Sequence, residues 1–312
     1  MVLDELFRYN LTGNSIFLPL DHARDHDPAV MRQFADDLHR RFPLLGAAAE
    51  LDGERFCFRI SGVPAPRLVE DPRPHGGIGD FIEDWTHRAH SMFDAPLAQV
   101  VSGIAAGRRC WGLWMHHAVA DAPFIDHIVS LLRGVLQRGE RFEGAPDFNF
   151  LQQNALIARQ TAAAAGRSES YWRACASSLG RQATRDTVPI PTAETVSTVE
   201  WTLPKASTER LARALRATQA SSLALYSVAL GVAMDAAGWG GNRVALTTFS
   251  MRHLVPGPAC SGFYTTLMPF GLAAPAPGSS STAAVRDAAV ALRAGFDHAL
   301  MPPERISEPA SI

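Results

Sequence analysis

Two apolar runs joined by a short link limit what this chain can fold into more than any other feature. The runs span Leu97–Ile104 and Cys110–Met115, and the link between them is Ala105-Ala106-Gly107-Arg108. Such runs around a short glycine-containing link predict a β-hairpin. The second run continues directly into His116-His117-Ala118-Val119-Ala120-Asp121. A helix is predicted next over 123–137, because apolar residues recur on one side at helical spacing: Phe124, Ile128, Leu131, Leu132 and Val135.

The rest of the chain alternates helical and strand patterns, which predicts a mixed α/β fold. We expect helices over 27–42, with Pro28 in the first turn, and over 81–93, and a strand over 56–60. An alanine-rich region over 147–180 should hold a helix that ends near Tyr171-Trp172. Later elements are predicted as strands over 198–203, 244–249 and 263–271, a helix N-capped by Ser207, a buried helix over 224–236 and a helix over 283–300. The similar content of the halves predicts two lobes, 1–150 and 191–312, joined by a bridging segment, 151–190.

The composition excludes several classes of protein. With 312 residues, of which 47% are hydrophobic, the chain can bury a large core. Its 29 basic and 31 acidic residues give a net charge of −2, which argues against a nucleic-acid partner. The four cysteines lie far apart without a C-x-x-C pair, so neither a disulfide framework nor a structural zinc site is indicated.

The chain also lacks the patterns of a secreted or membrane protein. Asp4 and Glu5 stand where a signal peptide would carry positive charge. The most apolar stretch, 223–234, is too short to cross a bilayer. We therefore expect a cytoplasmic protein with no membrane partner.

The adjacent histidines favour proton transfer over metal binding. Successive strand residues face opposite sides of a sheet, so His116 and His117 cannot both reach one point. Together with Asp121, His117 would supply only two ligands, so we predict no metal site. A single neutral imidazole at the end of a strand can accept a proton from a hydroxyl or an amine. The alternative is a core histidine with satisfied hydrogen bonds, followed by an Asp121 that merely caps the next helix.

The His-His-x-x-x-Asp stretch resembles the HHxxxDG motif of condensation domains of nonribosomal peptide synthetases. Four other parts of the chain resemble motifs of that family, in the same order. They are Phe42-Pro43-Leu44-Leu45, Met92 to Leu97, Glu169 to Arg173, and Thr248 to Arg252 followed by Ser261 to Phe270. The corresponding family patterns are HPxLR, PFDLxxGPL, a YW pair on a helix, and VSGR with IGxFxNTLPLR. The resemblance covers about residues 10–300.

The resemblance implies a fold and an activity. It implies two lobes like those of chloramphenicol acetyltransferase, within the superfamily of CoA-dependent acyltransferases. It makes His117 the catalytic general base, His116 a buried support for the turn, and Asp121 a structural carboxylate paired with Arg252. The implied reaction, one of secondary metabolism, moves an acyl or aminoacyl group from a pantetheine thioester to an amine or hydroxyl acceptor. The thioester would be a CoA or an acyl or peptidyl carrier protein, and neither a bound cofactor nor a serine or cysteine nucleophile is required.

Two departures from the family pattern leave other hypotheses open. Ala122 stands where the motif has glycine, and the chain is shorter than most members of the family. We therefore expect a partial second lobe, which a second chain could complete. A catalytically inactive binding or scaffold protein with the same fold is the main alternative to an enzyme. A hydrolase that passes the acyl group to water through the same histidine is a third.

Overall fold

The computed structural model describes residues 15–20, 27–52, 55–62, 68–88, 93, 95–138, 144–179, 201–238, 243–254, 260–272, 275, 278 and 280–300. The chain divides into two compact units. Unit 1 comprises residues 1–158 and 251–265, and unit 2 comprises residues 159–250 and 266–312. Segment 251–265, which lies inside the predicted lobe of 191–312, thus groups with the first half of the chain.

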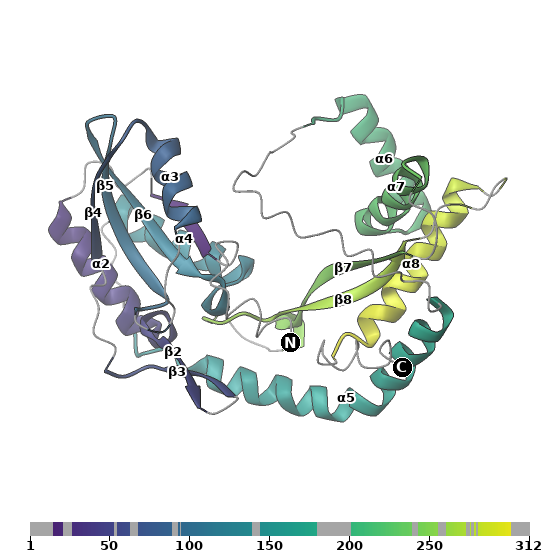
Figure 1. Cartoon of the computed structure of the whole chain (residues 1–312), viewed down its shortest axis with the longest axis horizontal. Helices are drawn as coiled ribbons and strands as arrows, with labels where there is room; N and C mark the ends of the chain where they lie inside the picture. The colour runs from purple at the N-terminus through teal and green to yellow at the C-terminus, as the bar shows by residue number, and fades with distance from the viewer. Residues whose placement is uncertain are drawn as a thin grey trace. The chain divides into compact units, whose positions relative to one another are not determined.

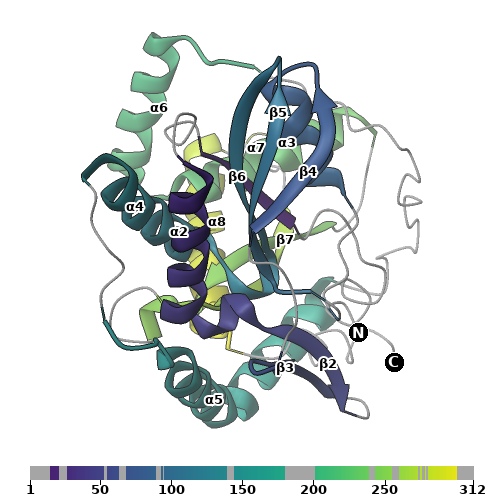
Figure 2. The same ribbon diagram turned by 90° about the vertical axis from the view of Figure 1, so that its left-hand side faces the viewer.

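Unit 1 is built around a four-stranded sheet with the strand order β1-β6-β5-β4 (Figure 1). The strands are β1 (Ser15–Pro19), β4 (Leu68–His75), β5 (Ala98–Ala105) and β6 (Arg108–His116). Strand β6 pairs antiparallel with β1 and β5, whereas β4 runs parallel to β5. Figure 2 shows β4, β5 and β6 side by side. The sheet therefore places the end of β6, at His116, beside the start of β1.

The predicted hairpin of β5 and β6 is confirmed. Ala105 pairs with Arg108, which leaves Ala106 and Gly107 as the two residues of the turn. Both have positive φ, 49° at Ala106 and 74° at Gly107. Positive φ at both central residues is the geometry of a type I′ turn, whose twist matches that of the flanking strands. This turn fixes the register, and with it the face on which each residue of β6 lies.

Both faces of the two central strands, β5 and β6, are buried, and alternate residues of β6 divide between the two faces. Trp111, Leu113 and Met115 join the core that includes residues of α2 (Pro28–Arg41) and α4 (Ala122–Arg138). On the other face, Cys110 and Trp114 pack with residues of α3 (Ile78–His87), which lies along the sheet in Figure 1. A strand buried on both faces reads as a continuous apolar run, and this explains the pattern in the sequence.

The helices that flank the sheet agree largely with prediction. Helix α2 begins after Asp27, whose carboxylate accepts a hydrogen bond from Ala29 N at 2.8 Å, and Pro28 occupies its first turn. In α4, Phe124, Ile128 and Leu132 are buried as expected. Helix α3 ends at His87, earlier than the predicted 81–93, and residues 89–92 lie outside the described part of the chain. The rest of unit 1 includes the short helical turns η3 (Pro43–Gly46), η4 (His117–Val119) and η5 (Met251–Leu254) and a hairpin of β2 (Ala48–Asp52) and β3 (Arg55–Arg59).

A long helix, α5 (Asn149–Leu179), contains the border between the two units at residues 158 and 159. The prediction that this helix ends near Tyr171-Trp172 is wrong. The residues that follow, Arg173 to Leu179, contain neither proline nor glycine and continue the helix. Arg173 also forms an i, i+4 ion pair with Glu169, at 2.5 Å, across the predicted end.

Unit 2 contains the helices α6 (Lys205–Thr218), α7 (Ser222–Ala236) and α8 (Ser281–Asp297) and the strands β7 (Arg243–Ser250) and β8 (Thr265–Leu272). In the described part of this unit, β7 and β8 form a two-stranded sheet, with α8 beside it in Figure 1. The core joins residues of α5, α7, β8 and α8 and one residue that follows α8: Trp172, Ala224, Val228, Met268, Val285, Leu292 and Ala299. The strands predicted over 244–249 and 263–271 and the helix over 283–300 thus correspond to β7, β8 and α8.

Three predictions for the start of unit 2 are wrong. Ser207 is not an N-cap, because α6 begins at Lys205 and the carbonyl of Pro204 accepts the first bonds from Ser207 N and Thr208 N, at 2.9 and 3.1 Å. Residues 201–203 are not in a strand, and 198–200 lie outside the described residues. Helix α7 is only partly buried: the side of Ala224 and Val228 packs into the core, whereas Tyr226 is 62% exposed.

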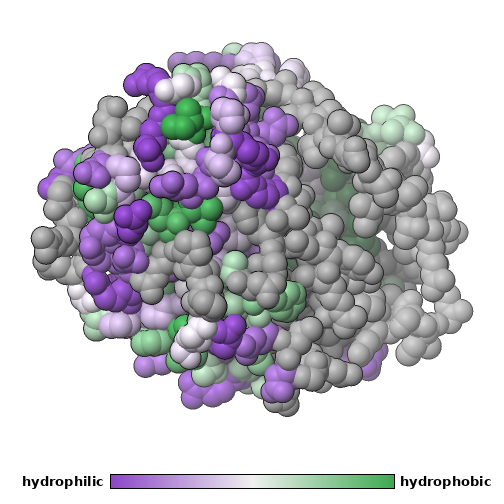
Figure 3. All heavy atoms as spheres, turned by 60° about the vertical axis from the view of Figure 1, so that its left-hand side comes forward, coloured by the Kyte–Doolittle hydropathy of each residue, from purple (hydrophilic) through white to green (hydrophobic). Residues whose placement is uncertain are grey.

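The surface hydropathy and the helix lengths can be compared with those expected of a membrane-spanning chain. On the face drawn in Figure 3, hydrophilic residues cover much of the described surface, with smaller hydrophobic areas between them. In the part of the chain that the structure describes, no single helix has the length and apolarity to cross a membrane. Only α6 and α7 taken together pass that test, and they are bent by 110° at the break between them.

Candidate active site

The site lies in unit 1, where β6 ends and α4 begins. His116 is the last residue of β6, His117 opens the short turn η4, and Asp121 immediately precedes α4. The turn closes with a backbone hydrogen bond from Ala120 N to His117 O, at 3.4 Å. The six residues from His116 to Asp121 thus take the chain from a buried strand to helix α4, with two imidazoles and a carboxylate at fixed places along the way.

One hydrogen bond fixes the orientation of the His117 ring. Its Nδ1 lies 2.7 Å from the carbonyl oxygen of Ala120. Because a carbonyl oxygen can only accept, Nδ1 must carry the proton, and in the neutral ring the lone pair is then on Nε2. The side chain is partly exposed. His117 therefore has the tautomer that a base acting through Nε2 requires.

His116 has the opposite hydrogen-bond role. Its side chain is buried, and its Nδ1 accepts a hydrogen bond from Ala118 N at 3.1 Å, which caps the turn that carries His117. Burial, together with the neighbouring His117, lowers the pKa of His116 from 6.5 to about 4. His116 is thus a neutral acceptor inside the protein at ordinary pH.

Asp121 is a buried carboxylate with several donors around it. Only 2% of the residue is exposed. Arg252 Nε donates to both of its oxygens, at 2.9 and 2.8 Å, and Arg252 Nη2 lies 2.6 Å from Oδ1. Phe124 N and Tyr264 N also donate to it, each at 3.3 Å. The carboxylate therefore caps α4 and also binds segment 251–265, so the two readings of Asp121 from the sequence describe the same side chain.

Arg252 extends this network to the loop before β8. Its Nη2 donates to the carbonyls of Cys260 and Gly262, at 2.9 and 3.4 Å, and its guanidinium carbon lies 4.7 Å from the centre of the Tyr264 ring. Gly262 N donates to Val119 O inside the histidine turn at 2.8 Å. A guanidinium with several fixed donors suits this role better than an ammonium group. The structure thus brings His116, His117, Asp121 and Arg252, all named from the sequence, into one connected arrangement.

Sequence reasoning did not single out Phe263. Its ring centre lies 4.9 Å from that of His117, with the planes at 80°, an edge-to-face arrangement. The signal was present in the position of Phe263, inside the Ser261–Phe270 segment that the family resemblance covers. No rule based on spacing alone could connect it with His117, since the two residues are 146 positions apart in the sequence.

Ala122 causes no backbone strain in place of the motif glycine. It is the first residue of α4. Among the described residues, only Ala106 and Gln219 are non-glycine residues with positive φ. A helical residue with negative φ accepts alanine readily. The departure from the motif at Ala122 therefore places no strain on the turn.

Cys260 is unsuited to act as a nucleophile. It is fully buried, and its Sγ lies 2.7 Å from Gln153 Oε1 and 3.4 Å from Tyr264 Oη. Burial raises the pKa of the Cys260 thiol, against the opposing effects of Tyr264 and Arg252. A thiol must ionise to attack, so this environment works against a covalent cysteine mechanism.

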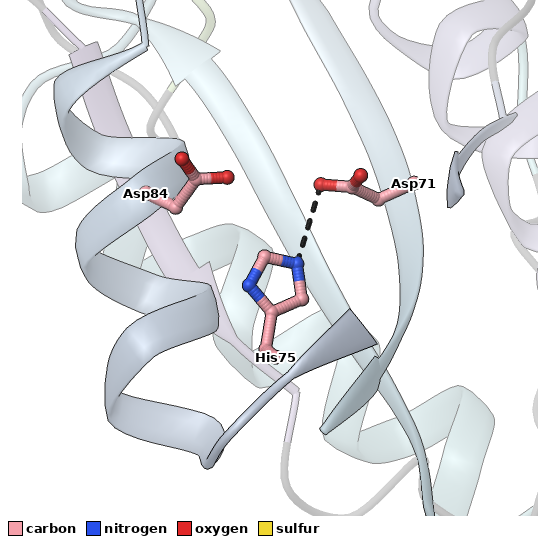
Figure 4. Close-up of side chains that lie close together, drawn as sticks. All are labelled: Asp71, His75 and Asp84. Atoms are coloured by element: carbon pink, nitrogen blue, oxygen red, sulfur yellow. Dashed lines mark ion pairs between the residues drawn. The ribbon is translucent and has the colours of Figure 1, made fainter. Parts of the chain in front are cut away.

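A second group of titratable side chains, on β4 and α3, has the composition of a metal site. Ligand atoms of Asp71, His75 and Asp84 lie within 4.8 Å of one another (Figure 4). His75 Nε2 is 3.4 Å from Asp71 Oδ2. Two arginines already occupy the carboxylates: Arg88 Nη2 lies 2.6 Å from Asp71 and 2.9 Å from Asp84, and Arg73 pairs with both.

Arg73 and Arg88 distinguish between a metal site and an ion-pair network at Asp71, His75 and Asp84. Burial alone would raise the pKa of Asp71, but hydrogen bonds from Arg73 and from the Trp85 indole, at 2.8 Å, outweigh it and lower the pKa. A cation placed here would have to displace two guanidinium groups from the same oxygens. The donor set is therefore that of an ion-pair network that joins β4 to α3.

Comparisons with known proteins identify the fold. No protein-family model matches the sequence, and no curated protein matches it. Solved structures do. The X-domain from teicoplanin biosynthesis matches with a TM-score of 0.68 and 17% identity, over 99% of this chain and 71% of that one. The first condensation domain of the calcium-dependent antibiotic synthetase gives the same score and identity, over 99% of this chain and 74% of that one.

A third match carries a different printed activity. The epimerization domain from the third module of tyrocidine synthetase B matches with a TM-score of 0.65 and 14% identity, over 96% of this chain and 74% of that one. Identities at this level establish the architecture and leave the reaction to be argued from the site. The chain therefore has the mixed α/β, chloramphenicol-acetyltransferase-like fold of the condensation domains of nonribosomal peptide synthetases.

Proposed function

We propose that this protein is an acyltransferase of the condensation type. It would move an acyl or aminoacyl group from a pantetheine thioester to an amine or hydroxyl acceptor, with His117 as the general base. The observation that carries the proposal is the 2.7 Å contact between His117 Nδ1 and Ala120 O, which assigns the lone pair to Nε2. The fold shared with condensation domains is consistent with this reaction class, and the orientation of the His117 ring supports its role as the base.

In the proposed reaction, Nε2 of His117 takes the proton of the acceptor N–H or O–H as that atom attacks the thioester carbonyl. The tetrahedral intermediate then collapses, the carbon–sulfur bond breaks, and the thiolate leaves with the proton from His117. The Ala120 carbonyl stabilises the imidazolium between these steps, because it accepts from Nδ1–H throughout. General-base catalysis of this kind contributes about 10²- to 10⁴-fold to a rate.

The other site residues would position the base. His116 and Asp121, which lie before and after His117 in the chain, are buried and accept hydrogen bonds from the backbone amides of Ala118 and Phe124. Proximity of the two substrates would supply the rest of the rate enhancement. The donor is a CoA thioester or the phosphopantetheine arm of a carrier protein, the acceptor a small amine or alcohol. Neither a metal ion nor a covalent enzyme intermediate takes part in the proposed reaction.

Transfer of a labelled acyl group tests the proposal. The purified protein is incubated with radiolabelled acyl-CoA or acyl-carrier thioesters and a panel of amines and alcohols, and product is separated from free acid. We expect His117→Ala to lower the transfer rate at least 100-fold while the folded structure persists by circular dichroism. His253→Ala, which removes an exposed imidazole from the same unit, should keep the parent rate.

The outcomes separate the three hypotheses. Full transfer by a folded His117→Ala variant would contradict the role of His117. No transfer from any donor, with retained binding of carrier protein or thioester, would favour the inactive binding or scaffold protein. Release of free acid in preference to acceptor product would favour a hydrolase. The epimerization domain among the structural matches adds one control, namely exchange of the α-proton of an aminoacyl donor in deuterated water.

A further inference from the structure

The ring of Phe263 lies against the ring of His117, the proposed base. The two ring centres are 4.9 Å apart and the planes lie at 80°. Phe263 is 37% exposed, so part of the ring stays accessible while another part contacts His117. An edge-to-face contact is attractive because the positive edge of one ring meets the negative face of the other. It therefore favours the rotamer of His117 in which the contact is made.

The backbone on both sides of Phe263 is bound to the histidine turn. On one side, Gly262 N donates to Val119 O at 2.8 Å. On the other, Tyr264 N donates to Asp121 Oδ2 at 3.3 Å. Because Val119 and Asp121 lie just after His117, the two hydrogen bonds fix the position of the Phe263 backbone, and so of its Cα, relative to the imidazole.

A third connection to the loop before β8 is made by Arg252. Arg252 bridges the Asp121 carboxylate and the Cys260 carbonyl, with Nη2 2.6 Å from the former and 2.9 Å from the latter. Gly262 has a φ of +134°, which directs the chain so that Phe263 and Tyr264 leave the loop in different environments: Tyr264 is buried and Phe263 is partly exposed. The Asp121–Arg252 ion pair thus helps to hold Phe263 in place.

We propose that Phe263 is a positioning residue for His117. Its ring keeps the imidazole in the rotamer in which Nδ1–H meets Ala120 O, and it covers part of the imidazole so that water does not compete for that bond. The Ala120 bond sets the tautomer, and the aromatic contact sets how long the ring stays in that orientation. The consequence for turnover rests on the function proposed above, whereas the effect on the ring itself does not.

The test uses the full chain with ¹⁵N- and ¹³C-labelled histidine and three substitutions, Phe263→Ala, Phe263→Leu and Phe263→Tyr. The His117 resonances are assigned by their loss in His117→Gln. At a pH where the ring is neutral, the nitrogen shifts of the parent should show the proton on Nδ1, and the chemical shifts of the ring protons should be displaced by the neighbouring aromatic ring. Phe148→Ala is the matched control, since Phe148 is a similarly exposed phenylalanine of unit 1 that pairs with Phe150 rather than with a histidine.

We expect Phe263→Ala and Phe263→Leu to remove the aromatic displacement and to mix the two neutral tautomers. With a substrate that the parent protein converts, these two variants should lower kcat about 10-fold or more and change KM less than threefold. Phe263→Tyr should restore the tautomer and the rate to within threefold. Retention of the parent tautomer and rotamer in Phe263→Ala, or failure of Phe263→Tyr to restore them, would overturn the proposal. If tautomer control follows this order but no variant, nor the parent, transfers an acyl group, the positioning role stands and the proposed function fails.

Discussion

Arg252 binds both carboxylate oxygens of Asp121 although 131 residues separate the two in the chain. The guanidinium is 13% exposed and the carboxylate 3%, so the pair lies almost entirely out of water. Backbone amides of Phe124 and Tyr264 complete the environment of the carboxylate. A buried pair of this kind adds little net stability over apolar packing, but loss of one partner leaves the other as an uncompensated buried charge.

Asp121→Ala should therefore lower the free energy of unfolding by about 3–5 kcal/mol. Arg252→Ala should have a loss of similar size, and the double variant should lose clearly less than the sum, because neither charge is then left alone. Urea unfolding followed by circular dichroism measures all three. Glu169→Ala, which breaks the exposed pair with Arg173, is the control, with a loss of about 0.5 kcal/mol or less. An Asp121→Ala variant as stable as the parent would show that the pair does not stabilise the fold.

Gly262→Ala should disturb the loop that contacts the histidine turn. An added Cβ would lie 2.7 Å from the Tyr264 ring, and the φ of +134° is strained for any L side chain. We expect a loss of about 2–4 kcal/mol in the free energy of unfolding, since a core clash adds to the backbone strain. Gly238→Ala is the matched control, with a φ of +78° and nothing within 4 Å of the added atom, so it carries the strain alone. Equal losses in the two variants would show that contact with Tyr264 is unimportant.

His116 should make the folded protein less stable as the pH falls. Its pKa is about 4 in the folded protein against an ordinary 6.5, so between these values the unfolded chain binds a proton that the folded chain does not. Stability contributed by this residue is complete above pH 6.5 and is lost as the pH falls to 4, by at most about 3 kcal/mol. His116→Asn retains an acceptor near the Nδ1 position without a titrating group.

The difference in unfolding free energy between the parent and His116→Asn, measured from pH 7.5 to 4.5, isolates this contribution from that of other groups. We expect the parent to lose more than the variant over this range. Parallel curves would mean that His116 titrates alike in the folded and unfolded chains.

Cys260 should be unreactive and dispensable for chemistry. The thiol is buried, whereas Cys57 is exposed. A thiol reagent such as Ellman's reagent should label Cys57 within minutes and Cys260 only after unfolding, because the thiolate is disfavoured by burial. Cys260→Ser should keep acyl transfer within about threefold of the parent. A loss of 100-fold or more in a folded Cys260→Ser variant would point to a covalent route instead.

Much of unit 1 could be predicted from local pattern. The alternation of Trp111, Leu113 and Met115 with the intervening residues gives the two faces of β6 directly, and the hairpin follows from the short link that includes glycine. The type I′ geometry at Ala106-Gly107 is known only from the structure. Helix α2 carried its own start signals in Asp27 and Pro28. Such features depend on neighbours a few residues away, which is why a single sequence reveals them.

The missed strands and the missed site contact share a cause in long-range contacts, whereas the misplaced start of α6 has a local one. Strands β1 and β4 were not predicted, since β4 contains two prolines and β1 is five residues long, yet both are held by pairing with β6 and β5. The start of α6 was misplaced because Pro204 provides the first accepting carbonyl in place of a side-chain cap. At the site, the resemblance to a family suggested the Asp121–Arg252 pair, but the contact of Phe263 with His117 required coordinates.

The return of segment 251–265 to unit 1 makes the first half of the gene insufficient by itself. A fragment that stops at residue 158 would contain both histidines and Asp121 but would lack the guanidinium 2.6 Å from that carboxylate and the buried ring of Tyr264. In such a fragment the Asp121 carboxylate would lack its ion-pair partner, and the space filled by Tyr264 would be empty. We therefore expect the fragment to aggregate when it is expressed alone. Adding residues 243–272 as a separate peptide offers a direct complementation assay. Recovery of solubility would show that the peptide binds the fragment.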